Sequence, residues 1–124
     1  MKLLLIDDDI NLSRVLAYQL QKNGFLVSTA KNGDEGLSLF FKESFDIIIT
    51  DIQMPDISGI DVLKKVREKD NQIIVIIITA HGSVEDAIEA CKLGANDYLT
   101  KPFGQEQLLF VIEKAVQLKQ LRDE

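Results

Sequence analysis

Short, uniformly apolar runs alternate with longer amphipathic stretches along this sequence, and that order leaves few folds open. The apolar runs are residues 3–6, 25–30, 45–49 and 73–78, with a shorter run at 97–99. Runs of this length, rich in Ile, Leu and Val and without polar alternation, are typical of strands covered on both faces. We therefore expect five strands that lie inside a sheet.

The stretches between these runs place apolar residues at helical spacing. The predicted helices cover residues 10–23, 34–43, 59–69, 84–93 and 105–122. Ser58 and Ser83 each precede an aspartate by three residues, which is a helix-start signal. Cys91, the only cysteine, is expected to pack as a small apolar side chain on the fourth helix. The other residues expected on buried helix faces are Leu12, Val15, Leu16, Leu20, Leu37, Phe40, Phe41, Ile60, Leu63, Val66, Leu108, Val111, Ile112, Ala115 and Leu118.

A strand followed by a helix, repeated five times, predicts an α/β fold. Strands separated by helices form a parallel sheet with helices on both faces, and right-handed crossovers restrict the topology. We therefore expect a doubly wound sheet of five parallel strands. A chain of 124 residues suits one domain, covering residues 1–124.

Composition excludes several classes of function. Asp and Glu outnumber Lys and Arg by 20 to 14, for a net charge of −6, so we expect no direct binding of nucleic acid. The longest aliphatic run, residues 73–78, is too short to span a bilayer. Three aspartates follow the first apolar run at once, which is unlike a secretory signal peptide. We expect a soluble, cytoplasmic protein without membrane contact.

Polar side chains follow the predicted strands where each strand ends. Asp7 and Asp8 come after the first, Asp51 after the third, Thr79 after the fourth and Lys101 after the fifth. Singly, such an aspartate can cap a helix, and such a lysine can be a solvated surface charge. Because the carboxyl ends of parallel strands share one edge of the sheet, where ligands bind, we expect these side chains to meet.

The charges gathered at this edge predict a metal site. Three carboxylates and one ammonium carry a net formal charge of −2, which one divalent cation would balance. Carboxylate oxygens suit Mg²⁺, and the sequence has no Cys/His cluster for zinc. With Mg²⁺, a lysine and a hydroxyl, the site is equipped to receive a phosphoryl group on a carboxylate. Charge alone does not decide which carboxylate accepts it.

The whole chain resembles the receiver domain of two-component response regulators. The motifs that carry the resemblance, in family order and spacing, are Asp7-Asp8, Asp51 followed by Ile52-Gln53-Met54-Pro55, Thr79-Ala80 and Lys101-Pro102-Phe103. The resemblance implies a flavodoxin-like fold with strand order 2-1-3-4-5. It also implies a signalling switch and not an enzyme, although a receiver catalyses its own phosphorylation and slow dephosphorylation.

The resemblance implies a role for each matching residue at the acidic site. Asp51 would be the phosphoacceptor, supplied from the phosphohistidine of a sensor histidine kinase. Asp8, Asp51 and the backbone carbonyl of Gln53 would ligate Mg²⁺, with Asp7 acting through water. Lys101 would contact the phosphoryl group.

Four further positions have roles that the resemblance implies. The peptide bond before Pro102 would be cis. Thr79 and Tyr98 would be switch residues that pass the signal to the face formed by the fourth helix, the fifth strand and the fifth helix. Gln53 and His81 would tune dephosphorylation through water access.

Residues 79–90 and 94–103 are most similar to receivers of NtrC-type transcriptional activators. Such receivers commonly precede an ATPase domain and a DNA-binding domain, so these output domains are expected partners if the chain is a fragment. The charged last residues, 119–124, are then expected to begin a linker. The expected output is control of transcription, with a phosphorylation-dependent homodimer as a further expectation.

Three alternatives to this function differ in what they require. A phosphorylation-independent receiver-like interaction module would not need Asp51. A haloacid-dehalogenase-like phosphatase would use Asp7 and Asp9 as its D-x-D pair, but it leaves Asp51 without a role and lacks a late acidic pair. A flavodoxin is disfavoured because aspartates replace its phosphate-binding loop.

Overall fold

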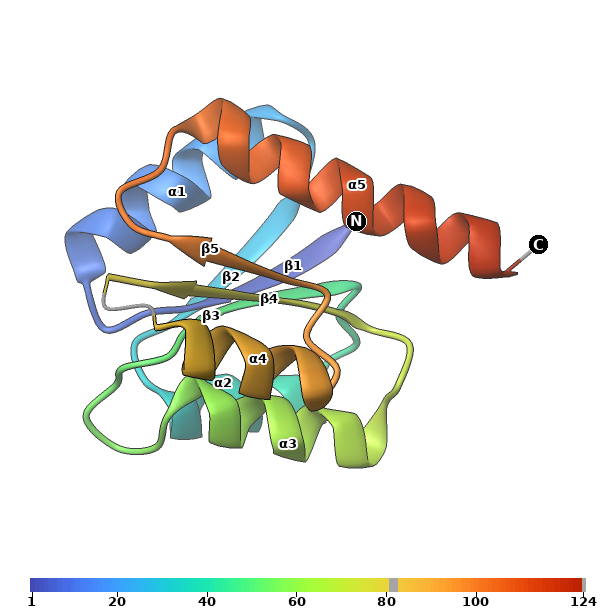
Figure 1. Ribbon diagram of the computed structural model, residues 1–124. Helices are drawn as coiled ribbons and strands as arrows, with labels where there is room; N and C mark the ends of the chain where they lie inside the picture. The colour runs from blue at the N-terminus through green and yellow to red at the C-terminus, as the bar shows by residue number, and fades with distance from the viewer. Residues whose placement is uncertain (81–82, 124) are drawn as a thin grey trace.

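The computed structural model describes residues 1–80 and 83–123, and strands alternate with helices throughout (Figure 1). The strands are β1 (Lys2–Ile6), β2 (Leu26–Ala30), β3 (Ile47–Asp51), β4 (Ile74–Thr79) and β5 (Asp97–Thr100). The helices are α1 (Ile10–Lys22), α2 (Gly33–Lys42), α3 (Gly59–Lys69), α4 (Val84–Lys92) and α5 (Gln105–Asp123). Every predicted strand and helix is present, with bounds that differ from the expected ones by at most two residues.

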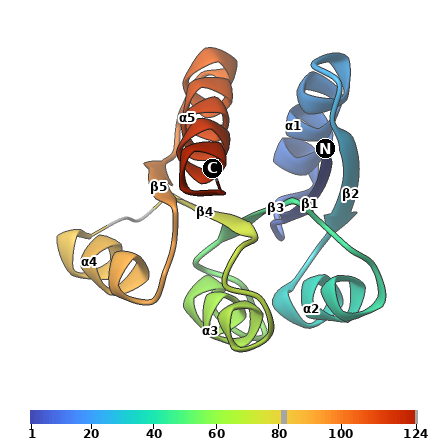
Figure 2. The same ribbon diagram turned by 90° about the vertical axis from the view of Figure 1, so that its right-hand side faces the viewer.

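The five strands form one parallel sheet in the order β2-β1-β3-β4-β5, which confirms the predicted topology. Helices α1 and α5 cover one face of the sheet, and α2, α3 and α4 cover the other (Figure 2). The chain changes direction across the sheet after β2, so β1 and β3 become neighbours. This is the switch point at which ligands bind in doubly wound folds.

Each face of the sheet has its own apolar core, because alternate strand residues point to opposite faces. Leu4 and Ile6 of β1 belong to the core under α2, α3 and α4, whereas Leu3 and Leu5 belong to the core under α1 and α5. Strands β3 and β4 are buried along their whole length. The two cores fix the register of the sheet, since a shift of one residue would exchange them.

Four side chains expected in the core are exposed: Val15, Phe41, Cys91 and Leu118. Each of the first three stands next in sequence to a buried residue of its helix, and one residue turns a helix by about 100°. Leu118 is exposed because the last turns of α5 extend past the sheet (Figure 1). Apolar spacing therefore predicted the helices correctly but overestimated the width of their buried faces.

The described residues contain no helix that is long and apolar enough to cross a membrane.

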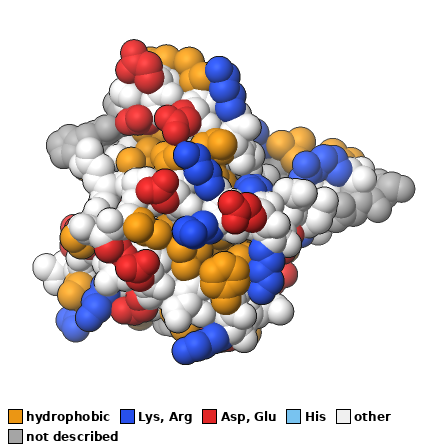
Figure 3. Space-filling model, turned by 90° about the horizontal axis from the view of Figure 1, so that it is seen from below, with side chains coloured by type: hydrophobic (Ala, Val, Ile, Leu, Met, Phe, Trp, Pro, Cys, Tyr) orange, Lys and Arg blue, Asp and Glu red, His pale blue; other side chains and the backbone are white. Residues whose placement is uncertain are grey.

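On the surface formed by α2, α3 and α4, acidic, basic and apolar side chains are interspersed (Figure 3). Neither sign of charge dominates that face.

Side-chain caps begin four of the helices. Asp9 accepts a hydrogen bond from the amide of Leu12 at the start of α1, and Asn32 accepts one from Glu35 at the start of α2. Ser58 and Ser83 cap α3 and α4 through the amides of the residues three positions later, as predicted. Such caps satisfy amides that have no partner within the helix.

Gly59 lets α3 begin directly against the end of β3. Its amide donates a 2.8 Å hydrogen bond to the carbonyl of Ile52. A Cβ atom at this position would lie 2.9 Å from both the carbonyl carbon of Asp51 and the Cα of Ile52. These are backbone atoms, so the contact can be relieved only by moving the segment that follows β3.

We expect Gly59→Ala to destabilise the fold by about 1–3 kcal/mol, the usual cost of overpacking a core. Gly104→Ala is the matched control, because a Cβ there meets nothing within 4 Å. Urea unfolding of both variants measures the difference. Equal midpoints for the two variants would contradict the close approach described at Gly59.

Candidate functional site

The register of the sheet brings the polar residues of four strand ends to the same edge. Ile6 of β1 pairs with Thr50 of β3, so the next residues, Asp7 and Asp51, are neighbours at the carboxyl edge. Thr79 of β4 pairs with Thr100 of β5, directly before Lys101. The predicted meeting of these side chains therefore follows from strand pairing.

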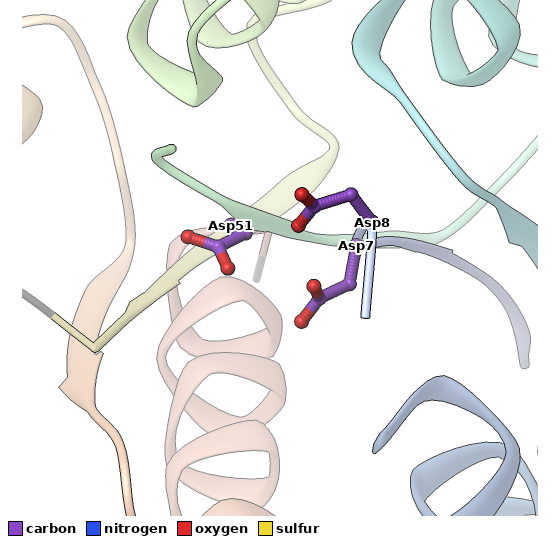
Figure 4. Close-up of side chains that lie close together, drawn as sticks. All are labelled: Asp7, Asp8 and Asp51. Atoms are coloured by element: carbon purple, nitrogen blue, oxygen red, sulfur yellow. The ribbon is translucent and has the colours of Figure 1, made fainter. Parts of the chain in front are cut away.

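Three carboxylates gather at this edge. One ligand oxygen each from Asp7, Asp8 and Asp51 lies within 4.8 Å of the others. Asp7 and Asp8 extend from the end of β1, and Asp51 lies beside them at the end of β3 (Figure 4). Asp7 is 1% exposed and Asp51 6%, whereas Asp8 is exposed. Burying two carboxylates this close together is costly unless a cation accompanies them.

Lys101 supplies a positive charge between the two buried carboxylates. Its Nζ donates hydrogen bonds of 2.9 Å to Asp7 Oδ2 and 2.8 Å to Asp51 Oδ2. Burial by itself would lower the pKa of Lys101, but its hydrogen bonds to Asp51 and Asp7 and the charges of these carboxylates raise it overall. Burial raises the pKa of Asp7, and the hydrogen bonds from Asp9 and Lys101 offset this in part. One ammonium therefore balances two buried carboxylates incompletely.

Backbone amides hold the other oxygens of the same two carboxylates. Asp9 N donates to Asp7 Oδ1 at 2.9 Å, and Gln53 N donates to Asp51 Oδ1 at 3.0 Å. The Asp9 carboxylate itself caps α1, so the structure assigns it to the helix start and not to the acidic cluster. This arrangement offers no support for an Asp7/Asp9 pair of the phosphatase type.

The remaining predicted residues lie around this cluster. Thr79 is fully buried at the end of β4, and its carbonyl accepts a 2.7 Å hydrogen bond from Lys101 N. The peptide bond between Lys101 and Pro102 is cis. Tyr98 is half-buried on β5 and packs against the core under α4; burial raises the pKa of its hydroxyl, and the Asp86 carboxylate raises it further. His81 lies outside the described residues.

An open pocket of about 440 Å³ leads to the acidic cluster. Its lining includes Asp8, Asp51, Lys101 and Gln53, but not Asp7. Among the three carboxylates, Asp51 is therefore the one that both lines this pocket and pairs with Lys101.

The donor set fits a hard divalent cation. All three side chains offer carboxylate oxygens, which suit Mg²⁺ and not the sulfur and nitrogen ligands typical of structural zinc. With Lys101, the cluster keeps the net formal charge of −2 that the sequence predicted.

Two residues that shape the site carry no signal in the sequence. Gly59 allows α3 to approach the backbone of Asp51. Asp56, in the loop after β3, accepts hydrogen bonds from Gly33 and Asp34, more than 20 positions earlier. A contact over such a separation depends on the packing of α2 beside α3, which no local pattern reveals.

The fold and the site together define a doubly wound α/β domain with an acidic, lysine-paired pocket at its switch point. The chain belongs to the response regulator receiver domain family, whose model matches residues 3–113. It is therefore a receiver domain of two-component response regulators, as the sequence motifs implied.

Known proteins of this family resemble the chain over nearly its whole length. The regulatory protein AtoC of Escherichia coli, an NtrC-type regulator, is 37% identical over 99% of this chain and 27% of its own. A receiver domain protein from Clostridium thermocellum has a TM-score of 0.90 and 38% identity, covering 97% of each chain. The response regulator TrrA from Thermotoga maritima, solved in complex with Mg²⁺-BeF, has a TM-score of 0.84 and 32% identity, covering 92% and 97%.

The chain spans half or less of the length of the first curated relatives that it matches. These relatives are named as regulatory or transcriptional regulatory proteins. Their similarity to this chain covers the receiver portion.

The raised pKa of Asp7 predicts how its removal changes stability with pH. The folded protein binds a proton at Asp7 more tightly than the unfolded chain does, so the stability that this group contributes is complete below about pH 4 and is lost as pH rises through the folded pKa. In metal-free protein at pH 7, we expect Asp7→Asn to increase the free energy of unfolding, because it removes a carboxylate that burial disfavours while Lys101 keeps Asp51 as a partner.

Urea unfolding with a chelator present, between pH 4 and pH 7, measures this effect. The gain is expected to shrink toward pH 4, because Asp7 becomes protonated in the folded protein first and then in the unfolded chain. A loss of stability at pH 7 would contradict the assignment of Asp7 as a carboxylate that is buried at a cost.

Proposed function

We propose that this receiver accepts a phosphoryl group on Asp51 from the phosphohistidine of a sensor histidine kinase. The observation that carries the assignment is that Asp51 both lines the open pocket and pairs with Lys101. Asp7 is paired with Lys101 but does not line the pocket, and Asp8 lines the pocket without a contact to Lys101 among the described hydrogen bonds.

Mg²⁺ is the cofactor that we propose for this reaction. Asp8, Asp51 and the backbone carbonyl of Gln53 would ligate it, and Asp7 would act through water. When bound, it supplies positive charge that neutralises the phosphoryl oxygens. The Mg²⁺-BeF complex of the Thermotoga relative, which has the same fold, supports this choice.

In the proposed transfer, a carboxylate oxygen of Asp51 forms a bond to phosphorus as the bond from phosphorus to the histidine nitrogen breaks. The imidazole leaves with the electron pair of that bond and takes a proton from solvent. Lys101 already lies 2.8 Å from Asp51 Oδ2, where it can pair with a phosphoryl oxygen. The protein thus supplies the nucleophile and a fixed positive charge.

Slow hydrolysis would end the signal. Water attacks phosphorus, the acyl phosphate P–O bond breaks, and phosphate leaves with the Asp51 carboxylate restored. Gln53 lines the pocket and is exposed, so we propose that it tunes water access. His81 is proposed for the same role from its position in the sequence. The cycle returns the protein to its starting state, as a switch requires.

Incubation with Mg²⁺ and acetyl phosphate is expected to add one phosphoryl group to the protein, observed by intact mass. Asp51→Asn is expected to remain unmodified, and a chelator should abolish the reaction in the parent protein. The adduct should be labile to hydroxylamine, because it is an acyl phosphate. A folded Asp51→Asn variant that is still modified would contradict the assignment of Asp51.

We propose that phosphorylation changes the α4-β5-α5 face through Thr79 and Tyr98. Thr79 ends β4 beside the site, and Tyr98 lies on the neighbouring strand, packed against the core under α4. Moving a two-state switch from 1:99 to 99:1 requires about 5.5 kcal/mol of differential interaction. New contacts to a doubly charged phosphoryl group are a suitable source of that energy.

The proposed output is a phosphorylation-dependent homodimer that controls transcription through output domains. Val84 and Ile88 lie four residues apart on α4 and are both exposed, as is Phe110 on α5. AtoC is more than three times as long as this chain, which leaves room in that relative for the ATPase and DNA-binding domains of an NtrC-type activator.

Phosphorylation is expected to strengthen dimerisation about tenfold, within the usual range of coupling between two sites. Sedimentation equilibrium with and without Mg²⁺ and acetyl phosphate measures the change. Ile88→Asp should weaken the phosphorylated dimer, whereas Val15→Asp, at an exposed apolar position on α1, is the matched control. Equal dimerisation constants for the two phosphorylation states would contradict the dimer proposal.

A further inference from the structure

We propose that Asp56 is a positioning residue that holds the loop after β3 against the N-terminus of α2, and thereby sets this loop for Mg²⁺ binding. The loop, residues 52–58, carries the Gln53 backbone carbonyl that the proposed function assigns to the metal. The inference therefore rests on that proposed function for its consequence, although the contacts that support it are independent of any metal.

The Asp56 carboxylate bridges two elements that are distant in sequence. Its Oδ1 accepts a 3.1 Å hydrogen bond from Gly33 N, and its Oδ2 accepts a 2.7 Å bond from Asp34 N. Both donors belong to the first turn of α2, whose amides have no partner within the helix. Burial tends to raise the pKa of Asp56, but the amides of Asp34, Ile57 and Gly33 lower it overall. Asp56 is thus a second cap on α2, supplied from the loop beside the site.

Packing adds a second contact at the same place. A Cβ atom on Gly33 would collide with the side chain of Ile57, the residue after Asp56, and would lie 3.2 Å from Val62 on α3. The backbone at the start of α2 therefore rests directly on the loop. A hydrogen-bonded contact and an apolar contact converge on one turn of α2.

With the contacts of Asp56, the loop of residues 52–58 is hydrogen-bonded at its start, its middle and its end. At its start, Gln53 N donates to Asp51 Oδ1, and at its end Gly59 N donates to the carbonyl of Ile52. Asp56 joins the middle of the loop to another helix. A ligand group that is held before the metal arrives loses less freedom on binding, so the affinity is higher.

The coupling must be reciprocal. If the contact between Asp56 and α2 favours Mg²⁺ binding, then Mg²⁺ binding must strengthen that contact by the same factor. The amides of Gly33 and Asp34 should therefore exchange more slowly with solvent when Mg²⁺ is present, although neither residue belongs to the metal site.

The test compares Asp56→Ala with Asn32→Ala. Asn32 caps the same turn of α2 through Glu35 N but makes this bond within its own segment, so its removal weakens the helix start without releasing the loop. Mg²⁺ affinity is measured by calorimetry, and amide exchange at residues 33, 34 and 53 is measured by NMR with and without Mg²⁺. Asp56→Asn, which keeps one acceptor oxygen and replaces the other with an NH₂ group, serves as the conservative variant.

We expect Asp56→Ala to weaken Mg²⁺ binding about tenfold, the low end of the loss seen when outer partners of metal ligands are removed. Asn32→Ala should bind Mg²⁺ as the parent does, and Asp56→Asn should fall between the two. In metal-free protein, exchange at Gln53 should be faster in Asp56→Ala than in Asn32→Ala.

Equal Mg²⁺ affinities and equal exchange at Gln53 for the two alanine variants would overturn the inference and leave the phosphorylation of Asp51 untouched. A parent protein that binds no Mg²⁺ would overturn the proposed function instead. In that case the metal-free exchange at Gln53 still decides whether Asp56 positions the loop. If Asp56→Ala fails to fold, Asp56→Asn decides by the same measurements.

Discussion

Lys101 is the residue on which the charges at the sheet edge depend. It contacts two carboxylates that are almost completely buried, one from β1 and one from β3. Removing Lys101 would leave both carboxylates without compensation, and an uncompensated buried charge costs about 3–5 kcal/mol. The two ion pairs join Lys101, which follows β5, to the ends of β1 and β3. They also leave excess negative charge at the point where a divalent cation and a phosphoryl group can be received.

The three carboxylates are chemically alike but placed differently, and their placement separates their proposed roles. Asp7 is held by Lys101 and by the amide of Asp9 and does not line the pocket. Asp8 is exposed toward the pocket. Asp51 combines access to the pocket with the contact to Lys101. Their positions at the ends of β1 and β3 thus separate a proposed metal ligand, a proposed acceptor and a buried charge among residues of one type.

The sequence predicted the sheet and the meeting of its polar strand ends, because both follow from local pattern. Strands covered on two faces are uniformly apolar, and parallel strands bring their carboxyl ends together, so Asp7, Asp51 and Lys101 could be placed side by side. The width of the buried helix faces could not be predicted. Val15 and Leu16 are adjacent and both apolar, and only packing against the sheet decides which of them is buried, whereas Leu118 lies where α5 extends past the sheet. The link from Asp56 to α2 was also missed, since it arises only when α2 and α3 pack together.

Asp51 is the proposed phosphoacceptor among three neighbouring carboxylates. Reduction of the phosphorylated protein with borohydride converts an acyl phosphate on aspartate to homoserine, and peptide mass spectrometry then locates the changed residue. We expect homoserine at position 51, with Asp7 and Asp8 unchanged in the same sample. Homoserine at position 7 or 8 would mean that access to the pocket and contact with Lys101 do not select the acceptor.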